Sequence, residues 1–510
     1  MDHSQESLLC EPLDLGSPID WAQELILRPG TTLLYSGSSE LGEYCEWDMI
    51  ALQPSETLIY EPEEVLHSEN EILLKLQEFM EAPWMNDQNE AISLHEWFSL
   101  SQRLGSALPM AHCMLSYELG AQARGISPRA SQHASPALWA ARYNAIYLFL
   151  RAEGRAWLIS SSKIALDHLK SQLINAYQSA QFRLNQNEAY PSLNANNQRV
   201  NCEDQKSSEK NQHLFTPMVN FETYHQCFEA LRESILSGDV YQMNLTLPLT
   251  YQREDRESAV ILFQRLCSVN AGQFSGFIQI DDRRSILSLS PERLVRWSGL
   301  LGERTEPSKR YIETAPIKGT RPRRKDPIQD EAERLGLLKS EKDAAEHVMI
   351  LDLERNDLGR ICESGSVRVV VNREARRYAT VHHLVSVVRG ELSRDIQLVD
   401  ILKAIFPGGS ITGAPKLRSM ELIRSLEPFP RGIYCGALGY LDPLGGGDLN
   451  LPIRTLFCNL DQLIYHAGGG IVADSSVDHE WDELWVKTQG VERAFSKCHT
   501  SSKNQQTSNQ

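Results

Sequence analysis

The stretch FETYHQCFEALRESILSGDVYQMNLTLPLTY, residues 221–251, encodes a helix followed directly by a strand. Apolar side chains recur at helical spacing as far as Ile235, and Gly238 is a typical C-cap. In the second half, 241–251, every other side chain is apolar, which predicts a half-buried strand. Pro248 has no N–H to donate, so it places this strand at a sheet edge or at a bulge.

Working outward from this stretch, the periodicity predicts further strands and helices on both sides. Strands are expected at 31–36, 145–152, 156–161, 366–371 and 463–473, and helices at 327–351, 416–426 and 479–497. The two kinds of element mix without a regular βαβ alternation. The sequence therefore favours an α+β fold with large antiparallel sheets over a doubly wound nucleotide-binding fold.

A break in composition divides the chain into regions. Residues 179–214 are rich in Asn, Gln, Ser and charge, and they hold too few apolar side chains to offset the entropy of ordering. We expect a mobile linker or surface loop there, between an N-terminal region, 1–178, and a C-terminal catalytic region, 215–498. The end of the chain, 499–510, has the same composition and is expected to be a disordered tail.

Charge and cysteine usage exclude several classes of protein. The 51 basic and 67 acidic residues give a formal net charge of −16, which argues against a nucleic-acid-binding surface. No apolar run is long enough to cross a membrane, and the start of the chain does not resemble a secretory signal. The ten cysteines form no CxxC pair, as is typical of free thiols in the reducing cytoplasm, where we expect this protein.

Two glycine-rich segments could approach a ligand closely. GGSITGAPK, 408–416, has the spacing of a phosphate loop, but Ala414 and Pro415 stand where that loop needs lysine and a hydroxyl residue. Small residues before a helix can still form an anion-binding turn, the alternative being a plain turn. Gly468–Gly470 would allow close backbone approach or simply a tight bend.

Ionisable residues provide the other candidates. Glu480, Glu483 and Lys487 share one face of an expected helix, and Glu346 lies on another. They form either a solvated face with a Glu483–Lys487 pair or a Mg²⁺ site, because this hard cation binds a few carboxylates and retains waters.

Four further ionisable side chains lie among apolar or small neighbours. These residues are Glu292, Lys318, His383 and Arg454. Such settings shift pKa values, although a structural role is the alternative for each residue taken alone. No GxSxG nucleophile elbow is present, which argues against a serine hydrolase.

Eight ordered blocks in the C-terminal half resemble the chorismate-utilising enzymes. They read SGDVYQMNLT, SLSPERL, PIKGTRPR, AEHVMILDLERNDLGR, HHLVS, GGSITGAPKLRSMELI, RGIYCGALGY and AGGGIVADS. A weaker likeness covers LLYSG at 33–37, CEWDMIA at 45–51 and MLSYELG at 114–120. The resemblance implies two large, mostly antiparallel sheets packed as a sandwich with helices outside, and a catalytic cleft in the C-terminal half.

The resemblance also implies roles for individual residues. Mg²⁺ would be held by Glu346 and Glu483, and Glu292 would protonate the departing 4-hydroxyl of chorismate. His383 matches the family histidine near the reacting ring. The two carboxylates of the substrate would be held by Arg454, Lys487, Tyr434, Thr412, Gly413, Gly468, Gly469 and Gly470.

Two positions indicate which reaction of the family is expected. Members that add water carry a lysine base in the block that reads YQMNL here, whereas this chain has Gln242, which cannot act as a base. Members that aminate C4 carry a lysine in the PIKGT block, where those that aminate C2 typically have alanine, and this chain has Lys318. Lys318 would attack C2 as the 4-hydroxyl leaves. Ammonia would then add at C4, giving 4-amino-4-deoxychorismate for the p-aminobenzoate branch of folate synthesis.

The alternatives are amination at C2, as in anthranilate synthases, and a catalytically silent tryptophan-binding paralogue. No cysteine lies in a GxCxGxQ-type nucleophile context, so we expect a separate glutaminase partner to supply ammonia. The connection between Glu292 and Lys318 is longer than is usual in the family, and we interpret the extra residues as a surface hairpin.

The N-terminal half could also bind tryptophan. The segment TTLLYSGSSELGEYCEWD, 31–48, resembles the region where family members bind this amino acid. Ser36, Asp48, Tyr241 and Met243 would line the pocket, with ordinary core between the sheets as the alternative.

Overall fold

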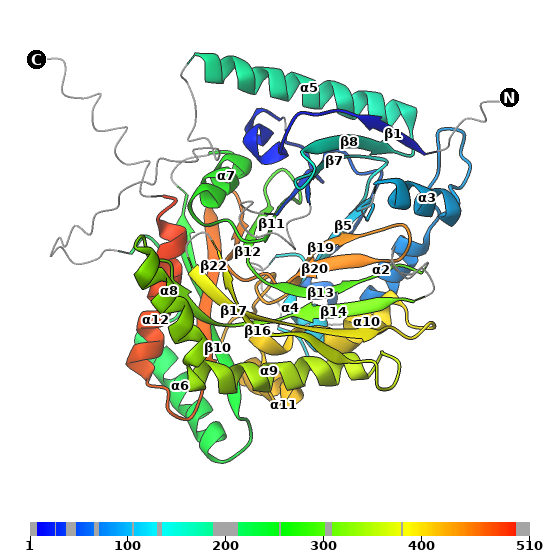
Figure 1. Ribbon diagram of the computed structural model, residues 1–510. Coiled ribbons are helices and arrows are strands. Elements are labelled where there is room, and N and C mark those ends of the chain that lie inside the picture. Colours follow the sequence, from blue (N-terminus) through cyan, green and yellow to red (C-terminus); the bar gives the residue numbers. More distant parts are fainter. Residues whose placement is uncertain are drawn as a thin grey trace, which may run out of the picture.

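The computed structural model describes residues 8–495 except for 26, 37–46, 66–70, 105–106, 130–134, 187–212, 254–256, 301–308 and 379–380. Its centre is a pair of large antiparallel sheets (Figure 1). The first has the strand order β1 (Leu9–Pro12), β8 (Arg155–Ser160), β7 (Ala145–Leu150), β3 (Trp47–Ala51), β2 (Thr32–Tyr35), β11 (Phe274–Gln279), β12 (Ser285–Ser290), β21 (Thr455–Cys458), β22 (Gln462–Ile471), β10 (Gln242–Gln252) and β18 (Gly413–Ala414), and β9 (Thr216–Pro217) pairs with β10.

The second sheet packs against the first and confirms the predicted sandwich. Its order is β15 (Ile317–Pro322), β17 (Val381–Glu391), β14 (Tyr311–Ala315), β13 (Arg293–Trp297), β20 (Gly447–Asn450), β19 (Ala437–Leu441), β5 (Ala111–Leu115), β6 (Leu138–Arg142) and β4 (Glu56–Tyr60), and β16 (Arg368–Arg377) pairs with β17. The sheets approach closely where Gly276 faces Leu438, since a Cβ on Gly276 would lie 2.8 Å from the Leu438 side chain. Thr32 and His112 form a buried hydrogen bond of 2.5 Å between the sheets.

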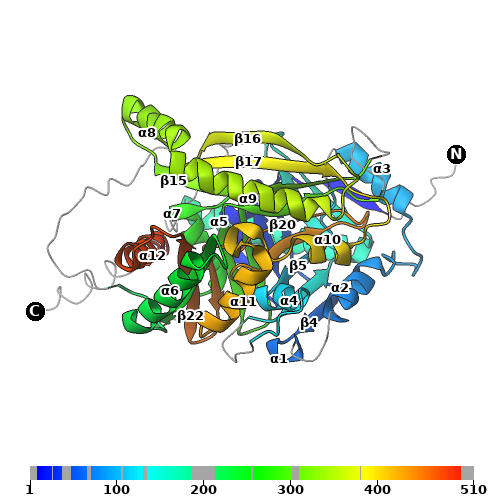
Figure 2. The same cartoon turned by 90° about the horizontal axis from the view of Figure 1, so that it is seen from below.

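Helices cover the outer faces, as Figures 1 and 2 show. They are α1 (Pro62–Val65), α2 (Glu71–Glu81), α3 (Leu94–Leu104), α4 (Tyr117–Gln122), α5 (Lys163–Asn185), α6 (Phe221–Leu236), α7 (Ala259–Asn270), α8 (Pro327–Lys339), α9 (Glu341–Gly359), α10 (Leu398–Ile405), α11 (Lys416–Leu426) and α12 (Val477–Glu492), with 3-10 turns η1 (Pro18–Asp20), η2 (Ala22–Glu24) and η4 (Gly409–Ile411). Helix α5 packs on β7 and β8, α12 on β22, α6 and α11 on β10, and α9 on β15 and β17.

Both chain regions contribute strands to both sheets. In the first sheet β2 pairs with β11, and in the second β5 pairs with β19, so the two regions share one core. The predicted start of the linker at 179 was wrong, because α5 continues to Asn185. Its polar composition obscured the helix: in that last part Ala180 still points inward, whereas Phe182 is 64% exposed. Residues 187–212 and the predicted tail lie outside the described residues.

Strand β10 forms as predicted but is not half-buried. All residues from Gln242 to Leu249 are buried, because helices α6 and α11 cover one face while the other faces the interior. The edge position of Pro248 is confirmed. The Pro248 carbonyl accepts the N–H of Met218 at 2.9 Å, so the Pro248 nitrogen faces the same, outer side of β10. On that side β10 pairs only with β9 and β18, through two residues each.

The helix expected at 327–351 is two helices, so that prediction was wrong. Ser340 is extended and caps α9, accepting a hydrogen bond from the Asp343 N–H at 3.2 Å. Between Glu292 and Lys318 the chain forms the antiparallel pair β13–β14, which lies within the second sheet and is largely buried. Residues 301–308 of the predicted surface hairpin lie outside the described residues, so that expectation stays a prediction.

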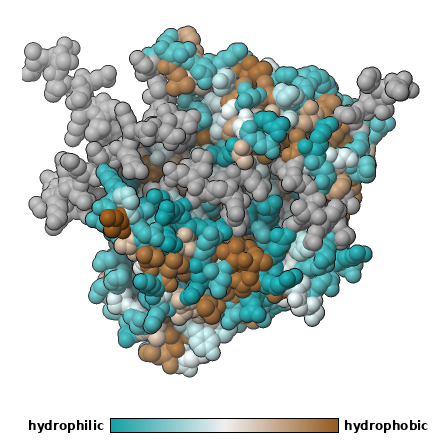
Figure 3. Space-filling model, in the orientation of Figure 1, coloured by the Kyte–Doolittle hydropathy of each residue, from teal (hydrophilic) through white to brown (hydrophobic). Residues whose placement is uncertain are grey.

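The surface is mixed in character. On the face in Figure 3, apolar patches are separated by hydrophilic side chains. None of the helices in the described residues is long and apolar enough to cross a membrane. The seven described cysteines are free thiols, as predicted.

Candidate active site

Lys318 projects from a bulge in strand β15. The register with β17 shifts between Ile317 and Thr320, which turns the intervening residues out of the ladder. Gly319 makes this bend possible: its φ is +83°, and a Cβ would lie 2.8 Å from the Leu337 side chain. The sequence Ile-Lys-Gly-Thr therefore aims a lysine away from regular pairing.

The amine of Lys318 is surrounded by charges from distant segments. It is half-buried and makes no hydrogen bond to a described residue. Burial lowers the pKa of Lys318, while Glu346, Glu292 and Glu483 act in the opposite direction and Lys487 reinforces the effect of burial. A lysine with a lowered pKa and no partner is suited to act as a nucleophile.

Glu292 is a buried carboxyl immediately before β13. It is 5% exposed, accepts a hydrogen bond from the Ser410 hydroxyl at 2.9 Å and is 3.4 Å from the Ile317 N–H. Burial raises its pKa to about 7, although Ser410 and the positive charge of Lys318 oppose the shift. A carboxyl that stays largely protonated near neutral pH can serve as a general acid.

The acidic residues predicted to bind metal lie on two helices at the same cleft. Glu346 is on α9 and Glu483 on α12, and the charges of both act on Lys318. Lys487 pairs with Glu483 at 2.8 Å and donates to the Gly468 carbonyl at 2.7 Å. The i, i+4 pair foreseen as the alternative is thus present in the absence of substrate.

The donor set fits Mg²⁺. The part of the chain that the structure describes has no cluster of three or more acidic, histidine or cysteine side chains arranged for a metal. Mg²⁺ commonly uses one or two carboxylates and takes its remaining oxygens from substrate and water. Two glutamates converging from α9 and α12 meet that requirement.

Arg454 offers a cation without a protein partner. It follows β20 on a turn with φ +52°, a conformation that costs a non-glycine residue strain, and its guanidinium makes no hydrogen bond or ion pair to a described residue. Burial lowers its pKa, yet arginine stays charged at neutral pH. A half-buried guanidinium with no partner among the described residues has the chemistry to bind an anion such as a carboxylate.

The glycines of both candidate segments are required by packing. A Cβ on Gly413 or on Gly468 would lie 2.2 Å from a backbone oxygen of β10, and one on Gly470 would lie 2.2 Å from the Gln242 amide. The buried Thr412 bonds the carbonyls of its own turn. Gly469 faces the other side, against the Glu480 carboxylate of α12. These contacts explain the glycines structurally, and their role toward a substrate stays a prediction.

His383 and Tyr434 are both buried at the edge of this cluster. Nδ1 of His383 lies 2.9 Å from the Thr320 hydroxyl, and burial together with Arg454 lowers its pKa to about 3, so the imidazole is neutral at pH 7. The Tyr434 ring stacks on His466 with centroids 5.3 Å apart. Tyr434 is 7% exposed.

Sequence reasoning missed the support beneath this cluster. Ser410, which orients Glu292, was quoted only as part of a turn. Lys416, the lysine of the GAPK segment, is buried and donates to Asp357 and to the carbonyls of Ile405 and Pro407. It therefore fastens the turn to α9 rather than reaching a phosphate. The sequence carried no signal for this burial, because Arg418 and Glu421 on the same helix are charged as well.

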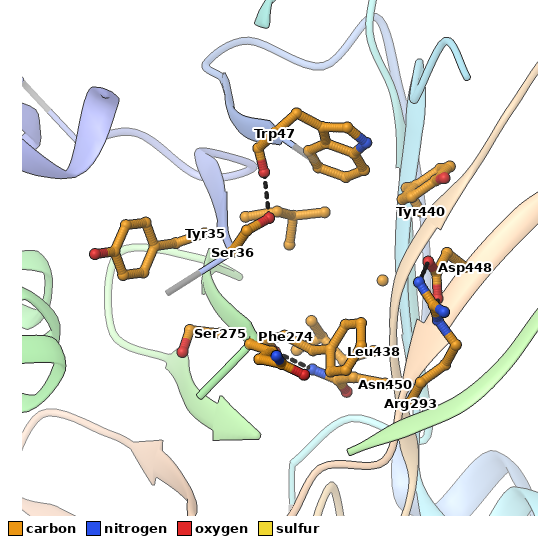
Figure 4. A pocket seen from close by; sticks show the side chains of 13 residues that line it. Tyr35, Ser36, Trp47, Phe274, Ser275, Arg293, Leu438, Tyr440, Asp448 and Asn450 are labelled. Atoms are coloured by element: carbon orange, nitrogen blue, oxygen red, sulfur yellow. Dashed lines mark hydrogen bonds and ion pairs between the residues drawn. The ribbon is translucent and has the colours of Figure 1, made fainter. Parts of the chain in front are cut away.

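Only some of the residues predicted to bind tryptophan lie at one cavity. A cavity of about 60 Å³ lies between the sheets, with Ser36, Trp47 and Tyr440 on its walls (Figure 4). Asp48 is fully buried and does not line the cavity, but its carboxylate accepts the backbone N–H of Ser36 at 3.0 Å. The predictions for Tyr241 and Met243 were wrong.

Strand order explains that error. Tyr241, 71% exposed, and the buried Met243 lie at the β18 end of the first sheet, whereas the cavity adjoins β2 and β11. Strands β12, β21 and β22 lie between β11 and β10, so these two residues cannot line the same small cavity.

Comparison with known proteins places this cleft in a family. The model of the chorismate binding enzymes matches residues 32–493. The chain belongs to the chorismate binding enzyme family.

Relatives and solved structures agree with this assignment. Aminodeoxychorismate synthase component 1 of Escherichia coli is 41% identical over 278 residues, covering 54% of this chain and 58% of that protein. Anthranilate synthase component 1 of Thermus thermophilus is 38% identical over 273 residues, covering 54% and 56%. The chain thus matches little more than half the length of these relatives. The crystal structure of anthranilate synthase component I from Streptococcus pneumoniae has the same fold, with 23% identity, a TM-score of 0.62, and 89% and 93% of the chains covered.

Proposed function

We propose that this family member aminates chorismate at C4 to give 4-amino-4-deoxychorismate, the activity of an aminodeoxychorismate synthase component I. The observation that carries the proposal is the Lys318 amine, which has no partner and lies within the influence of Glu292, Glu346 and Glu483. The name of the Escherichia coli relative supports the same reaction. The product would feed p-aminobenzoate and folate synthesis in the cytoplasm.

The geometry supports a two-stage reaction. The Lys318 lone pair forms a bond to C2 while both ring double bonds shift by one position and the C4–O bond breaks, and Glu292 gives its proton to the departing oxygen, which leaves as water. Ammonia then bonds to C4, both double bonds return to their original positions, and the C2–N bond to Lys318 breaks. The proton lost by Glu292 is restored from the attacking nitrogen. The net reaction converts chorismate and ammonia to 4-amino-4-deoxychorismate and water.

The remaining residues would hold the substrate. We propose that Arg454 and Lys487 bind its carboxylates, with the turn at Thr412–Gly413 and the backbone of Gly468–Gly470 beside them. Mg²⁺ held by Glu346 and Glu483 would neutralise carboxylate charge when bound. His383, neutral and buried next to Arg454, would stay uncharged beside the ring.

Product identity tests the function. The purified chain is incubated with chorismate, Mg²⁺ and an ammonium salt, and the product is identified by mass spectrometry and chromatography against anthranilate and isochorismate. We expect 4-amino-4-deoxychorismate. With glutamine in place of ammonium we expect no product unless a separate glutaminase is added. Anthranilate as the main product would favour the second candidate, a C2-aminating enzyme like the Thermus thermophilus relative. No turnover at all would favour a silent paralogue.

Metal dependence is the next prediction. Chelation with EDTA should abolish turnover, and excess Mg²⁺ should restore it. Glu483→Gln should raise the half-saturating Mg²⁺ concentration by about tenfold or more, because one of two charged ligands becomes neutral. Asp482→Asn is the matched control on the same helix, since Asp482 is exposed. An unchanged Mg²⁺ requirement in Glu483→Gln would remove this residue from the metal site.

The cavity of Figure 4 is proposed to bind tryptophan. The rings of Trp47 and Tyr440, with centroids 5.0 Å apart, offer an aromatic wall for the indole. Ser36 and the Arg293–Asp448 ion pair offer polar groups. Tryptophan at about 100 times its Kd should add about 2.7 kcal/mol to the free energy of unfolding. Thermal melts with tryptophan, and with leucine as control, provide the measurement. An equal midpoint with both amino acids would contradict the site.

A further inference from the structure

A second cavity, separate from that of Figure 4, lies behind the proposed chorismate site. Its volume is about 30 Å³, half that of the cavity in Figure 4, and exceeds what one water-sized molecule needs. Tyr434 and Thr455 form part of its wall, and Thr455 directly follows Arg454. The cavity therefore has room for a small polar molecule.

Two buried polar atoms without partners line this cavity. The Ser135 hydroxyl is 2% exposed and His466 is 8% exposed, yet neither Ser135 Oγ nor His466 Nδ1 has a hydrogen-bond partner among the residues that the structure describes. Leaving a buried polar atom unpaired is costly, and native proteins rarely do so. A donor and an acceptor at the wall of one cavity therefore indicate a small hydrogen-bonding occupant.

The charges around the cavity favour a neutral occupant. Burial and the nearby guanidinium of Arg431 lower the pKa of His466 to about 3, so the imidazole carries no charge at neutral pH. Arg431 itself is on the wall and is held by Glu427 at 2.7 Å. Most of the remaining lining is apolar. An ammonium ion would meet a fixed positive charge here, whereas neutral ammonia would not.

We propose that this cavity is the binding site for ammonia next to the chorismate site, with Ser135 and His466 as its hydrogen-bond partners. The inference rests on the proposed function, in which ammonia is the second substrate. The Ser135 hydroxyl donates to the ammonia lone pair, and Nδ1 of neutral His466 accepts an N–H. Held beside Tyr434 and Thr455, ammonia would be without its hydration shell at a cavity whose wall adjoins Arg454 along the chain.

Initial rates against ammonium chloride at constant pH and saturating chorismate test the site. Ser135→Val fills the cavity and removes the hydroxyl, and it should raise the KM for ammonia by about tenfold or more. The kcat and the KM for chorismate should stay within about twofold. Ser161→Val is the matched control, because Ser161 is also 2% exposed but does not line this cavity. It should leave all three constants unchanged.

A second variant covers the case in which Ser135→Val does not fold. Ser135→Ala removes an oxygen that bonds no protein atom, so it should fold normally and raise the KM for ammonia about three- to tenfold, the value of one hydrogen bond. An unchanged KM for ammonia in the folded variants would overturn the proposal and leave a structural water as the occupant. If the wild type makes no aminated product, the proposed function itself fails, which is a separate result.

Discussion

Lys318→Ala is expected to lower the rate of C4 amination by a factor of about 10³ or more, because it removes the covalent nucleophile. The variant should fold, since the Lys318 amine bonds no described residue and its strand is held by the ladder with β17. It should still bind chorismate, because Arg454 and Lys487 hold the carboxylates. Any residual product should shift toward attack at C2. Product analysis and chorismate titration by fluorescence provide the measurements.

The control for this variant is Lys339→Ala, which removes an exposed lysine at the end of α8. It should keep activity within about twofold of the wild type. Near-wild-type formation of 4-amino-4-deoxychorismate by Lys318→Ala would show that the covalent role is wrong. Lys318 would then be an electrostatic neighbour of the substrate, and the choice between C4 and C2 amination would reopen.

Glu292→Gln is expected to lower kcat by about 10²–10⁴-fold, the usual contribution of a general acid. Glutamine keeps the shape and can still accept from Ser410, but it has no proton to give to the 4-hydroxyl. The structural cost should be small because the charged form is already disfavoured by burial. The KM for chorismate should change little, which separates loss of the acid from loss of substrate binding.

The pH profile provides a second measurement of the same residue. The acid acts in its protonated form, and its pKa is raised to about 7. At saturating ammonia, the wild-type kcat should therefore fall as the pH rises above about 7. Well above this value the decrease in kcat should approach tenfold per pH unit. Glu292→Gln should lose this alkaline limb. Asp442→Asn is the control: this buried carboxyl also has a raised pKa, to about 6, but it only orders a turn. An alkaline limb that persists in Glu292→Gln would assign it to another group.

Local periodicity predicted most of the elements that form the site. Helix α11 begins and ends at the predicted residues, 416–426, and β10, β22 and α6 were each anticipated within one to three residues. Two of the failures have different causes. Burial of β10 on both faces depends on the helices that pack against it, and a periodic pattern records only the average environment of its own segment. The end of α5, up to Asn185, is exposed and mostly polar, so it has no apolar periodicity to indicate a helix.

The sequence by itself determined the family, the types of its secondary structure and the candidates for the reacting groups, because these follow from local patterns and from short ordered blocks. Only the tertiary structure decided the chemical state of those groups. The pKa of Glu292 is raised to about 7 because the folded core removes its carboxyl from water, an effect that outweighs the opposing hydrogen bonds from Ser410 and Ile317 and the charge of Lys318. Lys318 gains its environment from α9 and α12, which lie far from it along the chain. Ser135 Oγ and His466 Nδ1, which have no hydrogen-bond partner among the described residues, line one cavity only in the folded chain. A pKa or an unpaired atom depends on desolvation and on charges from distant segments, and these exist only once the chain has folded.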